Sequence, residues 1–188
     1  MLWIAALVIG ALVGRLTGGR LDNLARLRFR WAWLVVAVLV VRAAILLTPV
    51  RHVDGVQYVY LAALTALVAW TIWQIELVRG IWLIAVGSAL NLVVIATNGA
   101  RMPVAAALAG SLVQSGSAGQ YTLMTPESNL TWLADWVGLP GPFARLVTEA
   151  YSPGDVIVAV GIAAVVALAM RSQTGSLETR PRIVNDPP

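Results

Sequence analysis

The sequence predicts an all-α membrane protein with five transmembrane helices and one long loop. Of its 188 residues, 59% are hydrophobic and 12% are charged, whereas soluble domains average about 45–50% apolar and about 25% charged residues. The hydrophobic residues are also gathered in blocks, and a helix needs about 20 of them in a row, with a range of about 17–25, to cross a bilayer. Composition and block pattern together argue against an ordinary soluble domain.

Five apolar blocks are expected to form the spans of a single transmembrane domain, residues 1–170. Their approximate bounds are 2–17, 31–48, 56–78, 81–97 and 155–170. The first and last blocks are short, so each needs an extra turn or a thinner bilayer. The first is interpreted as a retained span, because Arg15 follows the apolar run, whereas a signal peptide carries its positive charge before it. The polar tail 171–188 is expected to be disordered and cytoplasmic.

The arginines predict the orientation of these spans. All 13 basic residues are arginines, and nine of them fall on one side of the alternating spans: Arg15 at the end of the first block, four between the first two blocks, Arg79, and three in the tail. Loops rich in arginine stay in the cytoplasm. The N-terminus is therefore expected outside, the C-terminus in the cytoplasm, and the loop 98–154 on the outer side.

The segment between the first two blocks is expected to lie on the membrane surface. Leucines recur there at helical spacing, which predicts a short interfacial helix with Asp22 as its N-cap. Four arginines surround them and are expected to meet anionic lipid headgroups, at about 1 kcal/mol each: Arg20, Arg26, Arg28 and Arg30. Charge that only sets the topology is the alternative, and nucleic acid is not an expected partner.

Small residues recur every four positions in the first and last blocks. They are Ala6, Gly10, Gly14 and Gly18 in the first, and Ala159, Ala163 and Ala167 in the last. Such faces let helices approach closely within lipid. They predict close packing inside the chain, with a homodimer as the alternative.

The loop 98–154 is expected to contain short helices that fold back onto the bundle. The segment 104–113 is apolar but too short to cross, which predicts a re-entrant or an interfacial helix. Thr125-Pro126-Glu127 predicts a helix start, with Trp132 and Trp136 on the face that meets the membrane surface. A further short helix is expected over 143–151, and Asp155 is expected to cap the last span.

Polar residues in or beside the spans are the candidate functional or structural site. Arg42 lies within the second block and is expected to pair with Asp155 or with carbonyl groups of residues 98–101. Asn91 lies near the middle of the fourth block and is expected to bond Thr65 or Thr71. The turn after the fourth span adds four more candidates: Asn98, Gly99, Arg101 and Pro103.

The residue counts exclude much chemistry. Without Cys there is no disulfide, thiol nucleophile or iron–sulfur ligand, and without Lys there is no Walker A loop or Schiff base. The single His52 lies near Asp54 and is interpreted as part of a solvated turn. The outer acids cannot be grouped from the sequence: Glu127, Asp135, Glu149 and Asp155. No catalytic, metal-binding or cofactor-binding residue is predicted, and no cofactor is expected.

Several short elements occur in a characteristic order. They are residues 18–24, the aromatic entry at Trp31, residues 98–104, Leu139-Pro140 and residues 153–155. In this order they resemble a bacterial family of small multi-spanning proteins known as a domain of unknown function (DUF 5317). The family's Asn-Gly-x-x-Met-Pro element is its most specific part, and this chain has alanine where that element usually has a second glycine. The resemblance implies residence in the bacterial cytoplasmic membrane and assigns no reaction.

Two functions from different classes remain open. The first is a non-enzymatic structural or partner-binding membrane component, favoured by the lack of a catalytic constellation and by the small-residue faces. The second is a small transporter or membrane enzyme with a site at the outer mouth near Arg42, residues 98–103 and Asp155. A filled apolar bundle favours the first, and a polar cavity at the loop favours the second.

Overall fold

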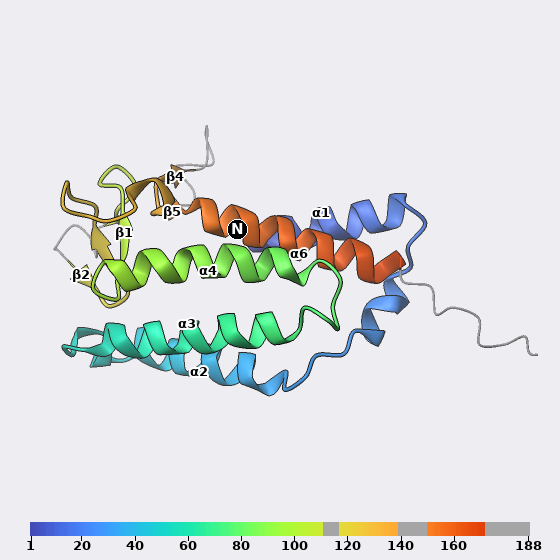
Figure 1. The fold of residues 1–188 in the computed structure, drawn as a ribbon, viewed down its shortest axis with the longest axis horizontal. Coiled ribbons are helices and arrows are strands. Elements are labelled where there is room, and N and C mark those ends of the chain that lie inside the picture. Colours follow the sequence, from blue (N-terminus) through green and yellow to red (C-terminus); the bar gives the residue numbers. More distant parts are fainter. Residues whose placement is uncertain (111–116, 139–149, 172–188) are drawn as a thin grey trace, which may run out of the picture.

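The computed structural model describes residues 1–110, 117–138 and 150–171, in which α-helices run along one long axis and a small cap of strands covers one end (Figure 1). Each predicted apolar block coincides with one of these helices; the first four blocks contain theirs, and α6 extends beyond both ends of the fifth. Their bounds are α1 (Leu2–Leu16), α2 (Trp33–Leu47), α3 (Val56–Trp73), α4 (Ile81–Thr97) and α6 (Pro153–Arg171). Short 3₁₀ helices connect them: η1 (Leu21–Arg26), η2 (Pro49–His52) and η3 (Thr131–Leu133).

Helix α6 packs closely against α1 through the small residues that the sequence singled out. A Cβ atom on Gly10 would lie 2.6 Å from the carbonyl oxygen of Ala163, and one on Gly14 would lie 3.3 Å from the Cα of Ala167. Glycine therefore allows the two backbones to touch. The prediction of packing within the chain is confirmed for these residues. Gly18 is outside this contact, because it lies in the following turn with a φ of +85°.

Glycines also bring α4 and α6 together. A Cβ on Gly87 would lie 2.5 Å from the carbonyl oxygen of Gly154, and one on Gly161 would lie 2.7 Å from the side chain of Ile84. Helix α6 thus lies between α1 and α4 as the central helix of this layer. The pair α2 and α3 forms the other layer, in which α3 packs on α4.

The loop before α2 is fixed to the end of α3 by a buried amide. The Gln74 side chain is fully buried; its Oε1 accepts from the backbone N–H of Arg30 at 3.1 Å, and its Nε2 donates to the Arg30 carbonyl at 3.0 Å. Trp70 Nε1 donates to the same carbonyl at 2.7 Å. The Arg30 guanidinium lies 5.5 Å from the Trp73 ring, a favourable cation–π contact. The two helices are therefore joined at this end as well as through η2.

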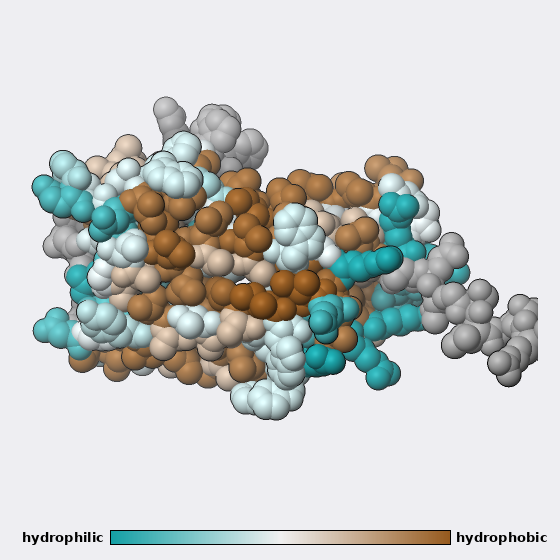
Figure 2. Space-filling model, in the orientation of Figure 1, coloured by the Kyte–Doolittle hydropathy of each residue, from teal (hydrophilic) through white to brown (hydrophobic). Residues whose placement is uncertain are grey.

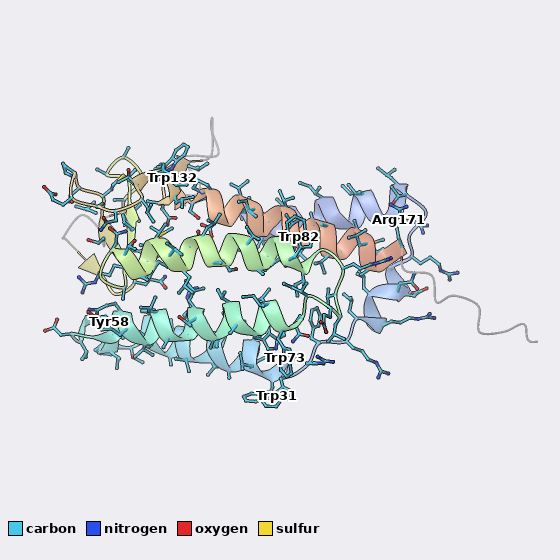
Figure 3. All side chains as sticks on the ribbon, viewed as in Figure 1. Trp31, Tyr58, Trp73, Trp82, Trp132 and Arg171 are labelled. Carbon is cyan, nitrogen blue, oxygen red and sulfur yellow. The ribbon has the colours of Figure 1, made fainter. Side chains whose placement is uncertain are left out.

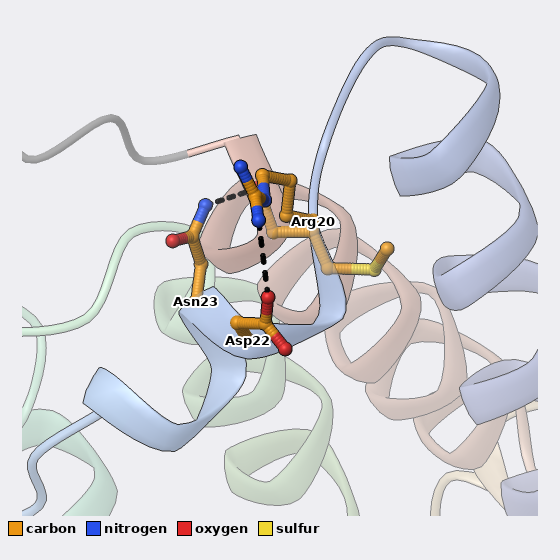
Figure 4. Close-up of polar contacts among 4 residues, drawn as sticks. Arg20, Asp22 and Asn23 are labelled. Carbon is orange, nitrogen blue, oxygen red and sulfur yellow. Dashed lines mark hydrogen bonds and ion pairs between the residues drawn. The ribbon is translucent and has the colours of Figure 1, made fainter.

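The start of η1 differs from the prediction. Arg20, not Asp22, is the N-cap, and Asp22 lies in the first turn, where its carboxylate contacts Arg20 Nη2 at 3.4 Å (Figure 4). The Asn23 amide and the Arg20 backbone N–H both donate to the carbonyl of Met170, at 2.8 and 2.9 Å. These bonds use a carbonyl that the end of α6 leaves free. The four arginines expected at lipid headgroups are all exposed at this end of the bundle.

The described part of the loop is built from short strands, turns and one short 3₁₀ helix, so two helix predictions are wrong over the residues described. Strand β1 (Met102–Val104) pairs in parallel with β3 (Tyr121–Leu123), and β2 (Ser117–Ala118) pairs antiparallel with β3. The segment expected to be a helix from residue 104 therefore begins as a strand, and its described part continues as a turn. Residues 111–113 lie outside the described part of the chain.

The second expected helix, after Thr125, is reduced to η3. Asp135 explains why: its backbone N–H and carbonyl bond to Pro103 and Ala105 of the β1 region, at 3.0 and 2.9 Å, which extends the chain there. Trp132 and Trp136 are nevertheless exposed, as expected. The helix expected over 143–151 falls mostly outside the described residues. The described end of that segment forms β5 (Ala150–Tyr151), which pairs with β4 (Val137–Gly138).

Apolar side chains cover the middle of the bundle, and polar ones gather at its ends (Figure 2). Two helices, α3 and α6, are long and apolar enough to cross a membrane, whereas α1, α2 and α4 are apolar but shorter. Length and composition therefore suggest membrane association, and the tail beyond residue 171 lies outside the description.

We expect Gly10→Val to destabilise the bundle, because α1 and α6 must separate to admit the side chain beside Ala163. Overpacking of this kind costs about 1–3 kcal/mol. The matched control is Ala5→Val, on the exposed side of α1, which should leave stability nearly unchanged. Thermal unfolding of the detergent-solubilised protein measures both, and equal midpoints for the two variants would contradict the packing argument.

Candidate functional site

A cavity whose mostly apolar wall carries several polar and charged side chains lies at the end of the bundle that the strands cap. It has a volume of about 240 Å³ and is lined by side chains from every α-helix named above and from the cap. A second cavity of about 460 Å³ adjoins it. The two share five lining residues: Trp3, Arg42, Tyr121, Asp135 and Asp155. The arginine and the two aspartates on the shared wall favour a binding site at this end of the molecule.

Asp155 is held by a network that joins α4 to the start of α6. Asn91 Nδ2 donates to Asp155 Oδ1 at 2.9 Å, and the Ser152 hydroxyl donates to Asn91 Oδ1 at 2.8 Å. The Ser152 backbone N–H donates to Asp155 Oδ2 at 3.1 Å, while the Asp155 N–H donates back to Ser152 Oγ at 2.9 Å. This reciprocal pair is a capping box.

The network corrects two predictions. Ser152 is the residue that caps α6, and Asp155 lies inside the first turn, so the predicted N-cap was three residues too late. Asn91 forms an interhelical bond, but with Asp155 rather than with Thr65 or Thr71. Those two hydroxyls donate to carbonyls of their own helix, at 2.8 and 2.7 Å. The spacing Ser-Pro-Gly-Asp contained the signal for the cap.

Asp135 is the functional candidate that the sequence did not single out. Only 5% of it is exposed, it lines both cavities, and its Oδ1 has no hydrogen-bond partner within the described residues. Burial, together with the nearby Asp155 carboxylate, raises the pKa of Asp135 to about 8. Its carboxyl is therefore mostly protonated at neutral pH.

Tyr121, on β3, lies near three ionisable groups of this site, Arg42, Asp135 and Asp155. Burial is the main reason that its pKa is raised; Arg42 opposes the rise, and Asp135 and Asp155 add to it. The side chain of Gln120 also hydrogen-bonds to it and lowers the pKa. The phenol therefore lies close enough to Arg42 and to both carboxyl groups to feel them all.

Arg42 lines both cavities and remains exposed. The predicted ion pair with Asp155 is wrong for this structure: among the described residues, the Arg42 guanidinium makes neither that pair nor a hydrogen bond to residues 98–101. The Asp155 oxygens instead accept hydrogen bonds from Asn91 and Ser152.

The turn after α4 supports the site from outside the cavities. Asn98 Nδ2 donates to the Asn129 carbonyl at 2.9 Å, and its Oδ1 accepts from the Asn129 N–H at 2.8 Å. Gly99 has a φ of +65°, which suits glycine. Pro103 is fully buried in β1, and its carbonyl holds Asp135. Arg101 has a buried Nε without a partner in the described part of the chain.

The structure thus divides the candidates into two groups. Arg42, Asn91 and Asp155 meet at the first cavity, where Asp135 and Tyr121 join them. The turn residues Asn98, Gly99, Arg101 and Pro103 do not line either cavity. Within the described residues, no group of three or more His, Asp or Glu side chains could hold a metal ion.

Comparison with known proteins identifies one family. Residues 26–167 match the model of a family described as a family of unknown function, DUF5317. The match covers most of the chain and includes the cavity residues from α2, α3, α4, α6 and the cap. No curated protein and no solved structure matches the chain.

The raised pKa of Asp135 predicts a stability that falls as the pH rises. The ordinary value is 3.8 and the folded value is about 8, so between these the unfolded chain releases a proton that the folded protein keeps. The contribution is fully present below about pH 4 and is lost progressively up to about pH 8. Thermal midpoints measured from pH 5 to pH 8.5 should therefore decline for the native chain.

Asp135→Asn should flatten this decline, because the amide does not titrate. Glu127→Gln is the control, since Glu127 is exposed, and it should preserve the slope. An unchanged slope in Asp135→Asn would show that the carboxyl does not control it.

Proposed function

Because the chain belongs to the DUF5317 family, whose function is unknown, we propose its function from the site: a multi-spanning membrane protein that binds a small molecule at its outer end. The observation that carries this is Asp135, a buried carboxyl group in a cavity that Arg42 also lines; one of its oxygens has no hydrogen-bond partner in the described part of the chain. Leaving a buried polar atom unpaired costs about 1–3 kcal/mol. A bound ligand that forms a hydrogen bond with this oxygen would offset that cost.

The proposal includes five spans, with the arginine-rich end in the cytoplasm and the cap outside a bacterial cytoplasmic membrane. At 1.5 Å per residue, the 18 residues of α3 extend about 27 Å, close to the hydrocarbon thickness of about 30 Å. The shorter helices suit a locally thinned bilayer. Trp31, Trp73 and Trp82 lie towards the arginine-rich end, whereas Trp132 and Tyr58 lie towards the cap (Figure 3). Aromatic residues near both ends support this placement.

The exposed arginines of the loop before α2 support contact with anionic lipid on the cytoplasmic side, as the composition suggested. A second membrane protein or a second copy of the chain remains a possible partner. The small-residue faces favour neither, because α1 and α6 use theirs against each other. A purely structural role is the weaker of the two predicted functions, since it leaves the polar cavity and Asp135 without a use. The site supports binding, and no reaction is proposed.

We expect cysteine labelling to report this topology. The chain contains no cysteine, so single substitutions need no altered background. A membrane-impermeant maleimide should label Glu127→Cys in intact cells, and should label Asp22→Cys only after the membrane is opened. Labelling of Asp22→Cys in intact cells would contradict the proposed orientation.

Blocking the cavity should abolish binding. Ala63 on α3 lines the cavity, so Ala63→Phe fills it without changing a charge, whereas the neighbouring Ala62 is exposed and Ala62→Phe is the matched control. Native mass spectrometry of protein purified in mild detergent should find the same small molecule on the native chain and on Ala62→Phe, but not on Ala63→Phe. Equal retention by both variants, or no retained molecule on the native chain, would contradict the proposal.

A further inference from the structure

We propose that the molecule bound in this cavity is a small zwitterion, in which an ammonium group and an acidic oxyanion lie a few bonds apart. The inference rests on the proposed function and adds the class of ligand. It follows from the way in which opposite charges are distributed over the cavity walls.

The acidic and basic groups come from different elements. Asp155 lies on α6 and Asp135 follows η3, and these two carboxyl groups are close enough to influence each other. Arg42 lies on α2, in the other layer of the bundle. It is not within ion-pair distance of either carboxyl group in the described structure. Tyr121 lines both cavities together with these three residues. The cavity therefore has an acidic side and a basic side that do not neutralise each other.

Each side retains a free binding capacity. The Asp135 Oδ1 is buried and unpartnered among the described residues, and it can accept a hydrogen bond from an ammonium group. The neighbouring Asp155 adds negative charge on that side but has both oxygens engaged. On the opposite side, the planar Arg42 guanidinium can bind a carboxylate or a phosphate through two parallel hydrogen bonds.

A ligand with a single charge fits this arrangement less well. A cation alone would meet Asp135 but would be repelled by Arg42. An anion alone would meet Arg42 but would face two carboxyl groups. A zwitterion satisfies both sides and leaves no group unpaired, which matters because unpaired charges in apolar surroundings are costly. Trp3 and Tyr60 line the same cavity, and aromatic rings favour an ammonium group.

The size and the access of the site limit the ligand. Volumes of about 240 and 460 Å³ compare with about 300–1,000 Å³ for typical ligand pockets. The exposed Arg42 lies five residues from the end of α2, about 8 Å at 1.5 Å per residue, which makes the basic side reachable from the capped end. A free amino acid and the ethanolamine phosphate headgroup of a lipid share the required chemistry.

The test compares zwitterions with their single-charge parts. The full-length protein in a maltoside detergent is titrated calorimetrically with glycine and with glycerophosphoethanolamine, and with ethanolamine, acetate and glycerol 3-phosphate. At least one zwitterion should bind at least about tenfold more tightly than each single-charge compound. Tight binding of glycine identifies a free amino acid, and tight binding of glycerophosphoethanolamine identifies the lipid headgroup.

Two variants test which residue binds each charged group of the zwitterion. Arg42→Gln should weaken the zwitterion at least about tenfold while ethanolamine binds at least as tightly as before, because the repelling guanidinium is gone. Asp135→Asn should weaken the zwitterion similarly while glycerol 3-phosphate binds at least as tightly as before. Arg79→Gln, at the opposite end of the bundle, is the control and should bind like the native chain. Thermal midpoints are measured alongside, so that a loss of binding is credited only to folded protein.

Three results would overturn the inference: a single-charge compound that binds as tightly as both zwitterions, variants that bind like the native chain, or no binding of either zwitterion. The cavity-blocking experiment separates this failure from that of the proposed function. If Ala62→Phe retains a molecule that Ala63→Phe loses, and that molecule is not a zwitterion, the binding function stands and the ligand class is wrong.

Discussion

The hydrogen bonds between Asn91 and the Ser152–Asp155 turn are the contact on which the site end of the molecule depends. They fix the start of α6 against α4 at the place where Gly87 and Gly154 bring the two backbones together. A polar network in apolar surroundings tolerates little displacement, because a broken bond leaves a buried group unpaired. The start of α6 in turn positions Tyr151, whose hydroxyl accepts from the N–H of Leu2 at 3.2 Å. One network therefore sets the relation of α1, α4 and α6 at the capped end.

The cap completes the site by a different means, through backbone pairing rather than side-chain bonds. Strand β1 carries Asp135 on one side and β3 with Tyr121 on the other. The tight turn from Asn98 to Ala100 allows β1 to start directly after α4, and Ala100 takes a φ of +63° there although glycine suits that conformation better. The Asn98–Asn129 bonds hold the neighbouring segment. The turn thus affects the cavity indirectly, by positioning β1, which in turn holds Asp135 and β3.

The helices could be predicted because the sequence patterns that indicate them involve residues close together in the chain. The site could be predicted only in part, because it is formed by residues far apart in the chain. Apolar blocks and four-residue spacing of Gly10 and Gly14 depend on neighbours along the chain, and both patterns predicted what the structure contains. The loop was mistaken for helices because Asp135 bonds to Pro103, a pairing across more than thirty residues that no short pattern reveals. For the same reason Asp135 remained one of four scattered acids. Arg42 and Asp155 were expected to pair because opposite charges attract, but the Asp155 carboxylate binds Asn91 and Ser152 instead, partners that charge alone does not predict.

The hydrogen bonds between Gln74 and Arg30 connect α2 and α3 at one end, and η2 connects them at the other. The two helices therefore form a pair that is fixed at both ends and packs on the remaining helices through α3. The cavity lies between this helix pair and the opposing layer. A molecule that binds both Arg42 on α2 and Asp135 on the cap would connect the helix pair to the cap. Such a molecule would hold the α2–α3 pair to the cap at the end opposite the Gln74–Arg30 bonds.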